Sequence, residues 1–481
     1  MKRISIFALL TLAVLLPSTA QGQINIVLSV ESDAFPTNSN AMLGAENING
    51  LFQRPDISAN GRYIGLEVDL VADSANDDAA VVIDLQSDSR TIVAQEGVSS
   101  LPAGVIGAID NAVEVNNTGQ AAFHAGDSIT GFWDGTNLTQ VVTTGDAAPA
   151  GAPLSDYGDN FARVQLTNAG VVGGEYDSSG TGTAPDTRED FLSLGSSLLV
   201  AADSAPLPGY VVQDFDLSGL TEAFSEFSVS AEGTEWIAEI RFDDDSTFDS
   251  TIAVNGTVVA QEGITIHTTP GGVDVTYDNT LDSDIADGGQ WITESRSDDS
   301  IDYTLVNGTV ILAEAEPAPN GSTLSSLSGV SINSNGDYIS LWNTDGDAIL
   351  ILNEDTILVT QGDTLSVDYN GDGTLEDLVV GNFPTEAFNL ADDGTLALLV
   401  NFDDTTGADV GNALVTLNIN DFIESILLGD VNLDGVVDFL DISPFITILA
   451  TGGFQLEADI DGNGVVDFLD ISPFIGILSN L

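Results

Sequence analysis

The chain is 481 residues long and carries 75 acidic and 9 basic residues, a formal net charge of −66. This charge argues against binding to nucleic acid or to an anionic membrane surface, because both need clustered Lys and Arg side chains. Cysteine is absent, which excludes disulfides, thiolate metal sites and cysteine nucleophiles. The 49 glycines and a hydrophobic content of 43% favour a turn-rich β protein over a disordered acidic chain or a helical protein.

Residues 1–22 read as a secretory signal peptide. Lys2 and Arg3 precede an apolar run from Ile4 to Leu16, and small residues follow as far as Ala20. The run is too short to span a bilayer comfortably. The sequence therefore predicts a secreted protein, located outside the cell or at the cell surface. A buried N-terminal strand or helix is the alternative.

One short sequence motif recurs seven times between about Arg54 and Leu417. Each copy ends a polar stretch on a glycine and continues into a short alternating apolar run. Glycine next to Asn or Asp tolerates the positive φ that two-residue hairpin turns need. A second hairpin signal follows in most copies, most clearly at Asn255-Gly256 and Asn307-Gly308, so each unit holds about four strands. The anchoring glycines are Gly61, Gly119, Gly170, Gly233, Gly289, Gly336 and Gly394.

Units of four strands are typical of propeller blades. The seventh unit stops short of a last strand after Ile419, whereas the chain after the signal peptide begins with the strand-like run Ile24 to Glu31. Pairing of this run into the seventh unit would close the ring and remove an exposed sheet edge. The predicted fold class is mainly β, a seven-bladed β-propeller over residues 23–420. A stack of β-sandwiches or an open solenoid is the alternative.

The repeats resemble the tandem Asn-x-x-Gly-x-x-x-Phe repeats of secreted bacterial proteins. The segment from Asn116 to Phe123 comes nearest to the full phrase, and elsewhere the aromatic residue is replaced or absent. The resemblance implies an architecture and transfers no activity.

The strongest motif is a duplicated loop near the C-terminal end. In both copies, oxygen-bearing side chains occupy positions 1, 3, 5, 9 and 12, glycine occupies position 6, and position 7 offers its backbone carbonyl. Calcium prefers about six to eight such oxygen ligands. Because four carboxylates in one loop repel one another without a cation, we expect folding here to be linked to Ca²⁺. The predicted ligands are Asp430, Asn432, Asp434, Val436, Asp438 and Asp441, then Asp459, Asp461, Asn463, Val465, Asp467 and Asp470.

Each loop runs into the same Ile-Ser-Pro-Phe-Ile segment, which begins an apolar run expected to be a short helix. Two such loop–helix units resemble a type I dockerin domain, over residues 429–481 after a linker at 421–428. The resemblance implies a small α-helical calcium-loop domain that docks onto a cohesin-like or cell-surface protein.

In dockerins, partner choice rests largely on loop positions 10 and 11. Here these are Phe439-Leu440 and Phe468-Leu469, where many dockerins carry small hydroxyl residues. The resemblance therefore implies that Phe439, Leu440, Phe468 and Leu469 bind the partner. The alternative is that both pairs pack the core of the small domain.

A weaker candidate calcium loop lies within the repeats, with Asp368, Asn370, Asp372 and Glu376 as ligands. Its position 12 is Val379, so the closing carboxylate of a full calcium loop is missing. An ordinary acidic turn is the alternative.

No catalytic residue and no cofactor-binding loop is predicted. The two histidines, His124 and His267, lie in different repeats, and neither a nucleophile-elbow nor a phosphate-binding phrase is present. We therefore expect a secreted calcium-binding adhesion or anchoring protein, whose propeller presents a surface for a glycan or protein ligand, with no membrane span.

The alternatives are an extracellular polysaccharide-degrading enzyme, because dockerins usually accompany such enzymes, and a surface-layer component. The enzyme should show two or three convergent carboxylates at the mouth of the propeller channel, flanked by aromatic residues.

Overall fold

The computed structural model describes residues 24–29, 48–70, 78–126, 128–179, 189–202, 223–242, 248–369, 373–384, 387–422, 428–432, 436–451, 453, 458, 460 and 465–479. The predicted signal peptide at 1–22 lies outside these residues. The chain divides after Ile419 into two compact units, which are described separately. No helix in the described ranges is long and apolar enough to cross a membrane.

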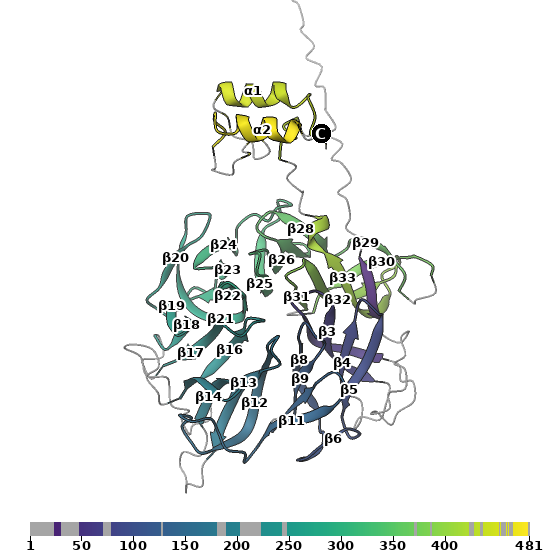
Figure 1. The fold of residues 1–481 in the computed structure, drawn as a ribbon, viewed down its shortest axis with the longest axis vertical. Coiled ribbons are helices and arrows are strands. Elements are labelled where there is room, and N and C mark those ends of the chain that lie inside the picture. The colour runs from purple at the N-terminus through teal and green to yellow at the C-terminus, as the bar shows by residue number, and fades with distance from the viewer. Residues whose placement is uncertain are drawn as a thin grey trace, which may run out of the picture. The chain divides into compact units, whose positions relative to one another are not determined.

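Among the described residues, the first unit contains seven antiparallel sheets of four or more strands and one two-stranded sheet (Figure 1). The first sheet holds β2 (Ile48–Ile57), β3 (Tyr63–Leu70), β4 (Asp78–Asp84) and β5 (Ser89–Gln95). After the small hairpin β6 (Ser100–Leu101) and β7 (Gly104–Val105), the second holds β8 (Ile109–Val115), β9 (Ala121–Ala125), β10 (Ile129–Trp133) and β11 (Leu138–Thr143). The third holds β12 (Asp156–Leu166), β13 (Val172–Ser179), β14 (Glu189–Leu194) and β15 (Ser197–Ala201).

The remaining sheets continue in chain order. The fourth holds β16 (Phe224–Val229), β17 (Trp236–Arg241), β18 (Ser250–Val254) and β19 (Thr257–Gln261). The fifth holds β20 (Ile266–Thr268), β21 (Asp274–Ala286), β22 (Gln290–Ser297), β23 (Asp302–Val306) and β24 (Thr309–Ala313). The sixth holds β25 (Leu324–Ile332), β26 (Tyr338–Thr344), β27 (Ala348–Leu352) and β28 (Thr356–Thr360). The seventh holds β29 (Thr364–Val367), β30 (Glu376–Asn382), β31 (Phe388–Leu390), β32 (Thr395–Asp403), β33 (Asp409–Asn418) and β1 (Asn25–Ser29).

These sheets are the blades of a closed propeller. Their innermost strands contact one another in the order β2, β8, β12, β16, β21, β25, β31 and back to β2. In the seventh blade, β1 pairs antiparallel with β33 and supplies the strand that the C-terminal part of the repeats lacks. Leu28 of β1 is fully buried, in a cluster with Ile64 of the first blade and Leu414 of the seventh. The predicted seven blades and their closure are confirmed, and the solenoid and sandwich alternatives are wrong.

The seven anchoring glycines lie in the turn between the innermost strand of each blade and the strand that follows it in the chain. All have positive φ, from 67° at Gly61 to 87° at Gly394. Each N–H donates to the carbonyl three residues earlier, as from Gly119 to Asn116 at 2.9 Å. The glycine is therefore the fourth residue of a longer turn, and not a central residue of a two-residue turn as expected. Glycine suits this place because it adopts the left-handed conformation without a steric cost.

The second unit holds two short helices, α1 (Ile442–Thr451) and α2 (Ile471–Leu478), after the 3₁₀ turn η1 (Ile419–Asp421). Phe445 of α1 and Phe474 of α2 stack with their ring centroids 4.4 Å apart. They centre a small core to which position 8 of each loop also contributes a valine, Val437 in the first and Val466 in the second. Equivalent residues of the two sequence repeats therefore occupy equivalent places in the core of this unit.

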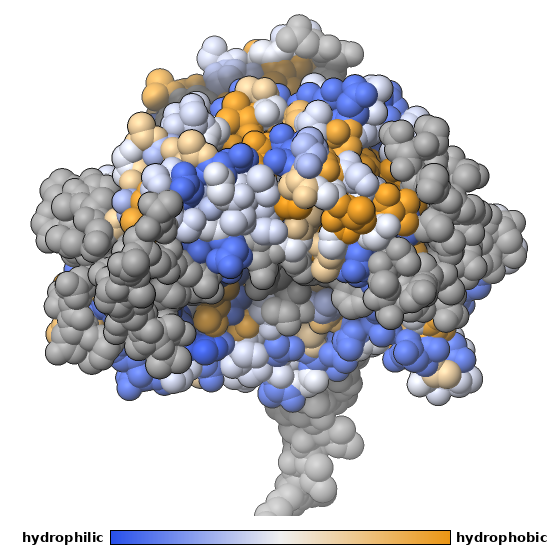
Figure 2. Space-filling view, turned by 90° about the horizontal axis from the view of Figure 1, so that it is seen from below, coloured by the Kyte–Doolittle hydropathy of each residue, from blue (hydrophilic) through white to orange (hydrophobic). Residues whose placement is uncertain are grey.

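The surface mixes apolar and polar side chains. On the face that Figure 2 shows, apolar residues form groups set among polar ones. Small exposed apolar groups are normal on a soluble protein, because there is not enough polar surface to cover it.

Candidate functional site

The two calcium-loop segments have matching geometry in their described parts. In the first, the carboxylate oxygens of the fully buried Asp441 accept the backbone N–H of Asn432 at 2.9 Å and of Asp438 at 2.8 Å. In the second, Asp470 is also fully buried and accepts the N–H of Asp467 at 2.8 Å. The Asp470 side chain makes no capping hydrogen bond to α2, so this carboxylate serves its loop and not its helix.

The other predicted ligands are only partly covered by the structure. Asp430 is buried, whereas the side chains of Val436 and Val465 are exposed, as suits residues that would offer a backbone carbonyl. Among the described residues, no group of three or more His, Asp or Glu side chains is placed to hold one metal ion. Asp434, Asp459, Asp461 and Asn463 lie outside them.

The donor chemistry of the loops fits calcium. Carboxylate, amide and carbonyl oxygens are the ligands that this hard cation prefers. The buried carboxylates of Asp441 and Asp470 accept backbone N–H groups from the described parts of their own loops.

The Phe-Leu pairs at loop positions 10 and 11 project into solvent. Phe439 is 74% and Phe468 is 78% exposed, and Leu440 and Leu469 are exposed as well. The alternative that these pairs pack the core of the small domain is therefore wrong. Each pair is therefore an exposed apolar group on the surface of the small unit.

The candidate loop inside the propeller stays a prediction. An oxygen of Asp368 accepts the N–H of Gly373 at 2.9 Å, and Glu376 accepts the N–H of Tyr369 at 3.0 Å. The two other predicted ligands, Asn370 and Asp372, lie outside the described residues.

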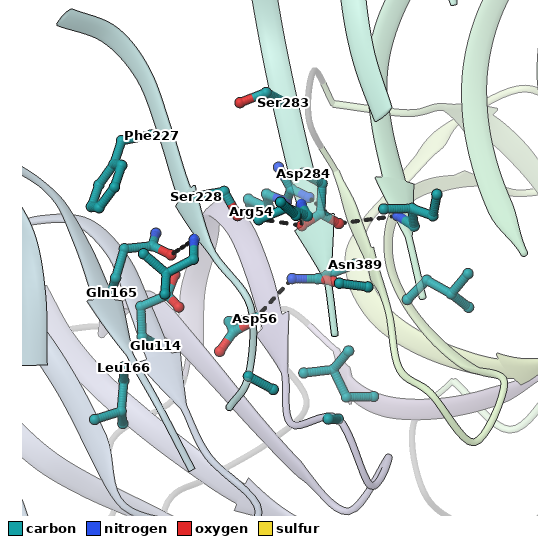
Figure 3. A pocket seen from close by; sticks show the side chains of 18 of the residues that line it. Arg54, Asp56, Glu114, Gln165, Leu166, Phe227, Ser228, Ser283, Asp284 and Asn389 are labelled. Atoms are coloured by element: carbon teal, nitrogen blue, oxygen red, sulfur yellow. Dashed lines mark hydrogen bonds and ion pairs between the residues drawn. The ribbon is translucent and has the colours of Figure 1, made fainter. Parts of the chain in front are cut away.

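A polar cavity of about 560 Å³ lies where the innermost strands of the blades converge. Its wall holds the residue five positions before the anchoring glycine in six of the seven blades, and Figure 3 shows these side chains around one space. They are Asp56, Glu114, Gln165, Ser228, Asp284 and Asn389. The equivalent residue of the sixth blade, Ser331, donates to Asp284 at 2.9 Å.

Hydrogen bonds at several of these side chains join one blade to its neighbour. The backbone N–H groups of Val115, Val229 and Ile332 donate to the side chains of Asp56, Gln165 and Asp284, at 2.6, 2.8 and 3.0 Å. The amide of Asn389 donates to the second oxygen of Asp56 at 3.0 Å and so joins the last blade to the first (Figure 3). The ring therefore has a structural role in closing the propeller.

Ion pairs join the residues that lie two positions before the ring residues on some of the innermost strands. Arg54 of the first blade contacts Asp282 of the fifth blade at 3.0 Å. The sixth and seventh blades stand between these two in the ring. Their residues at the same position are the small Gly329 and Ala387, which carry no long side chain. Arg163 contacts Glu226 of the next blade at 3.4 Å. Both guanidinium charges near the cavity are thus matched by carboxylates.

Three carboxyl groups of the cavity wall have raised pKa values. Loss of hydration on burial raises the pKa of Asp56 to about 6, although the Val115 N–H and the Arg54 charge oppose the rise. Burial, and then the charge of Asp56, raises the pKa of Glu114 well above its usual range. Burial also raises the pKa of Asp284, against the opposing charge of Arg54. Groups perturbed in this way within a cavity are candidates for binding or proton transfer.

The cavity meets one of the two conditions set for an enzyme. Asp56, Glu114 and Asp284 converge on it as carboxyl groups, but Phe227 is the sole aromatic among the described residues that line it. Sequence reasoning missed this site because the seven ring positions carry five different residue types, Asp, Glu, Gln, Ser and Asn. Their constant place, five residues before each glycine and followed by an apolar residue, is the signal that would have found it.

Comparison with known proteins identifies the C-terminal segment. Residues 428–478 match the dockerin type I domain family, which confirms the predicted dockerin domain after a seven-bladed propeller. Dockerin type I domains bind calcium and dock onto cohesins, and the proteins that carry them are typically extracellular or at the cell surface.

The propeller resembles solved structures only distantly. The β-propeller domain of the Trilobed protease from Pyrococcus furiosus is 9% identical, covers 79% of this chain and 99% of its own, and has a TM-score of 0.41. The WD40 domain from Toxoplasma gondii coronin is 11% identical, with coverages of 82% and 84% and a TM-score of 0.39. No curated protein matches the chain. The seven-bladed assignment therefore rests on the strand pairing of this chain itself.

Proposed function

We propose that this is a secreted anchoring protein, whose dockerin domain folds around calcium and docks onto a cohesin-like partner while its propeller presents a ligand-binding surface. The observation that carries the proposal is the coincidence of the dockerin match at 428–478 with two loop–helix units that both expose a Phe-Leu pair. The signal-like residues 1–22 support export.

Calcium would be held by Asp430, Asn432, Asp434, Asp438 and Asp441 with the carbonyl of Val436, and by the equivalent set Asp459, Asp461, Asn463, Asp467, Asp470 and Val465. The cation would supply the positive charge that lets these carboxylates share one loop. The chain itself contributes the closing aspartates, which already gather the loop N–H groups.

Docking is tested by measuring binding of the full chain to a panel of type I cohesin domains, with calcium and with a chelator. We expect binding with calcium alone. Replacement of one pair, as in Phe439→Ser with Leu440→Ser, should retain docking, because the pair Phe468-Leu469 offers the same surface. Replacement of both pairs should abolish it.

The matched control is Ile264→Ser, which removes an exposed apolar side chain of the propeller. Docking that persists in chelator, or that survives replacement of both pairs, contradicts the proposal.

A second candidate function is polysaccharide degradation in the propeller cavity. Convergence of Asp56, Glu114 and Asp284, with raised pKa values, is the observation in its favour. Release of reducing sugar ends from plant or algal glycans, lost in both Asp56→Asn and Glu114→Gln, would support it. A purified wild-type chain that cleaves none of the glycans speaks against it.

A further inference from the structure

The cavity at the centre of the propeller is strongly acidic. Seven of its lining residues are carboxylates and two are arginines. Arg54 lies against Asp282 and Asp284 at 3.0 and 3.7 Å, and Arg163 is 2.9 Å from Glu175 behind the wall. Both guanidinium groups are paired with carboxylates, and acidic residues outnumber basic ones by seven to two in the wall, so the cavity favours a cation over an anion. The carboxylates of the wall are Asp56, Glu114, Glu226, Asp282, Asp284, Asp287 and Asp392.

Glu114 differs from the rest of the ring in its contacts. Asp56 accepts from Val115 and Asn389, and Asp284 accepts from Ser331 and Ile332. Within the part of the chain that the structure describes, the Glu114 carboxylate accepts no hydrogen bond, although it belongs to the cavity wall and feels the charges of Asp56 and Arg54. A carboxylate placed in this way is costly to the folded protein unless a cation or a hydrogen-bond donor meets it.

The size of the cavity and the polar side chains that line it indicate which kind of cationic ligand would fit. A volume of about 560 Å³ is of the size that small organic ligands occupy in proteins. Beside the carboxylates stand hydroxyl and amide side chains, from Ser228, Ser283, Gln165 and Asn389 (Figure 3). Carboxylates recognise an ammonium group, and hydroxyl and amide groups recognise the hydroxyls of a sugar.

We propose that the propeller cavity binds an amino sugar, with its protonated amine at Glu114 and Asp56 and its hydroxyls at the neighbouring polar side chains. The proposal rests on the ligand-binding role of the propeller and names the chemical class of that ligand. A neutral sugar would offer no cation to the Glu114 carboxyl group, and a simple diamine would offer no hydroxyl groups to the polar side chains of the wall.

The test is titration calorimetry of the full chain in calcium with a tetramer of glucosamine. The controls are the tetramer of N-acetylglucosamine, which has no charge, and cadaverine, which has no hydroxyls. We expect the glucosamine tetramer to bind at least about tenfold more tightly than either control, because it alone offers both the charge and the hydroxyls. Equal affinity for the acetylated tetramer, tighter binding of cadaverine, or no binding of the glucosamine tetramer at millimolar concentration overturns the proposal.

Variants assign the binding to the cavity. Glu114→Gln should weaken binding of the glucosamine tetramer by about tenfold or more, and Glu114→Asp, which keeps the charge, should lose less. Asp299→Asn removes one exposed carboxylate from the turn between β22 and β23 and should change nothing. Glu114→Gln that binds like the wild type overturns the proposal, provided that its circular dichroism shows a folded propeller. If Glu114→Gln is not folded, Glu114→Asp takes its place: it should bind the glucosamine tetramer more weakly than Asp299→Asn, and equal binding by these two variants overturns the proposal.

Calcium-dependent docking to cohesin domains is measured on the same variants. Docking retained in Glu114→Gln while sugar binding is lost separates the two roles. If no sugar binds and docking remains, the inference about the cavity fails and the anchoring function stands.

Discussion

Replacement of Asp56 by asparagine should stabilise the propeller at neutral pH. Asparagine is the same size as aspartate and keeps an oxygen for the Val115 N–H, which donates to Asp56 at 2.6 Å. The amide of Asn389, 3.0 Å from the other oxygen, can turn to present its own oxygen to the new NH₂ group. The substitution therefore removes the charge and leaves the contacts between blades in place.

The magnitude follows from the pKa of Asp56. Burial raises it from 3.8 to about 6, so the folded state holds the proton more tightly than the unfolded state. Stability from this group is therefore fully present below pH 4 and is lost as the pH rises towards and above 6. The shift of about two pKa units corresponds to about 3 kcal/mol at pH 7.5, and to about 1 kcal/mol at pH 4.5.

The assay is urea unfolding of the full chain and of Asp56→Asn at both pH values, in calcium, followed by tryptophan fluorescence. The variant should be more stable by about 3 kcal/mol at pH 7.5 and by about 1 kcal/mol at pH 4.5. Asp299→Asn, an exposed carboxylate, controls for the loss of one charge from a protein of net charge −66. A difference that stays constant between the two pH values, or a variant that is less stable than the wild type at pH 7.5, refutes the reasoning.

Four further substitutions test the fold. Leu28→Ala empties a fully buried site in the strand that closes the ring, and should lower the free energy of unfolding of the propeller by about 2–5 kcal/mol in chemical denaturation. Gly65→Ala would place a Cβ 2.0 Å from a backbone oxygen of the next blade and should prevent stable folding, whereas Gly289→Ala, with open space and a φ of 75°, should cost about 1 kcal/mol by the same measurement. Phe445→Ala removes one ring of the stack with Phe474 and should melt the C-terminal unit, seen as lost helical circular dichroism in calcium, while the propeller transition stays unchanged. Melting of both units together, or unchanged stability in the first two cases, would contradict these expectations.

The sequence alone sufficed for the count and closure of the blades. Glycine adopts the left-handed conformation at little cost, so each of the seven turns is marked by a glycine in the sequence. The strand-like run at Ile24 likewise stands out because the last repeat lacks a strand. The dockerin loops are visible for a related reason, since a calcium loop brings its ligands together within a few neighbouring residues. Each of these features depends on residues that are close together in the sequence, and so it can be recognised without the tertiary structure.

The cavity was decided by tertiary structure. Asp56, Glu114 and Asp284 come from different blades and differ in their sequence surroundings. They meet because the closed ring brings the same register position of every innermost strand to one axis. Their raised pKa values arise from the exclusion of water by the whole ring, which no single repeat can provide. Long-range burial and charge depend on closure, and so they could be recognised only when the seven blades were in place.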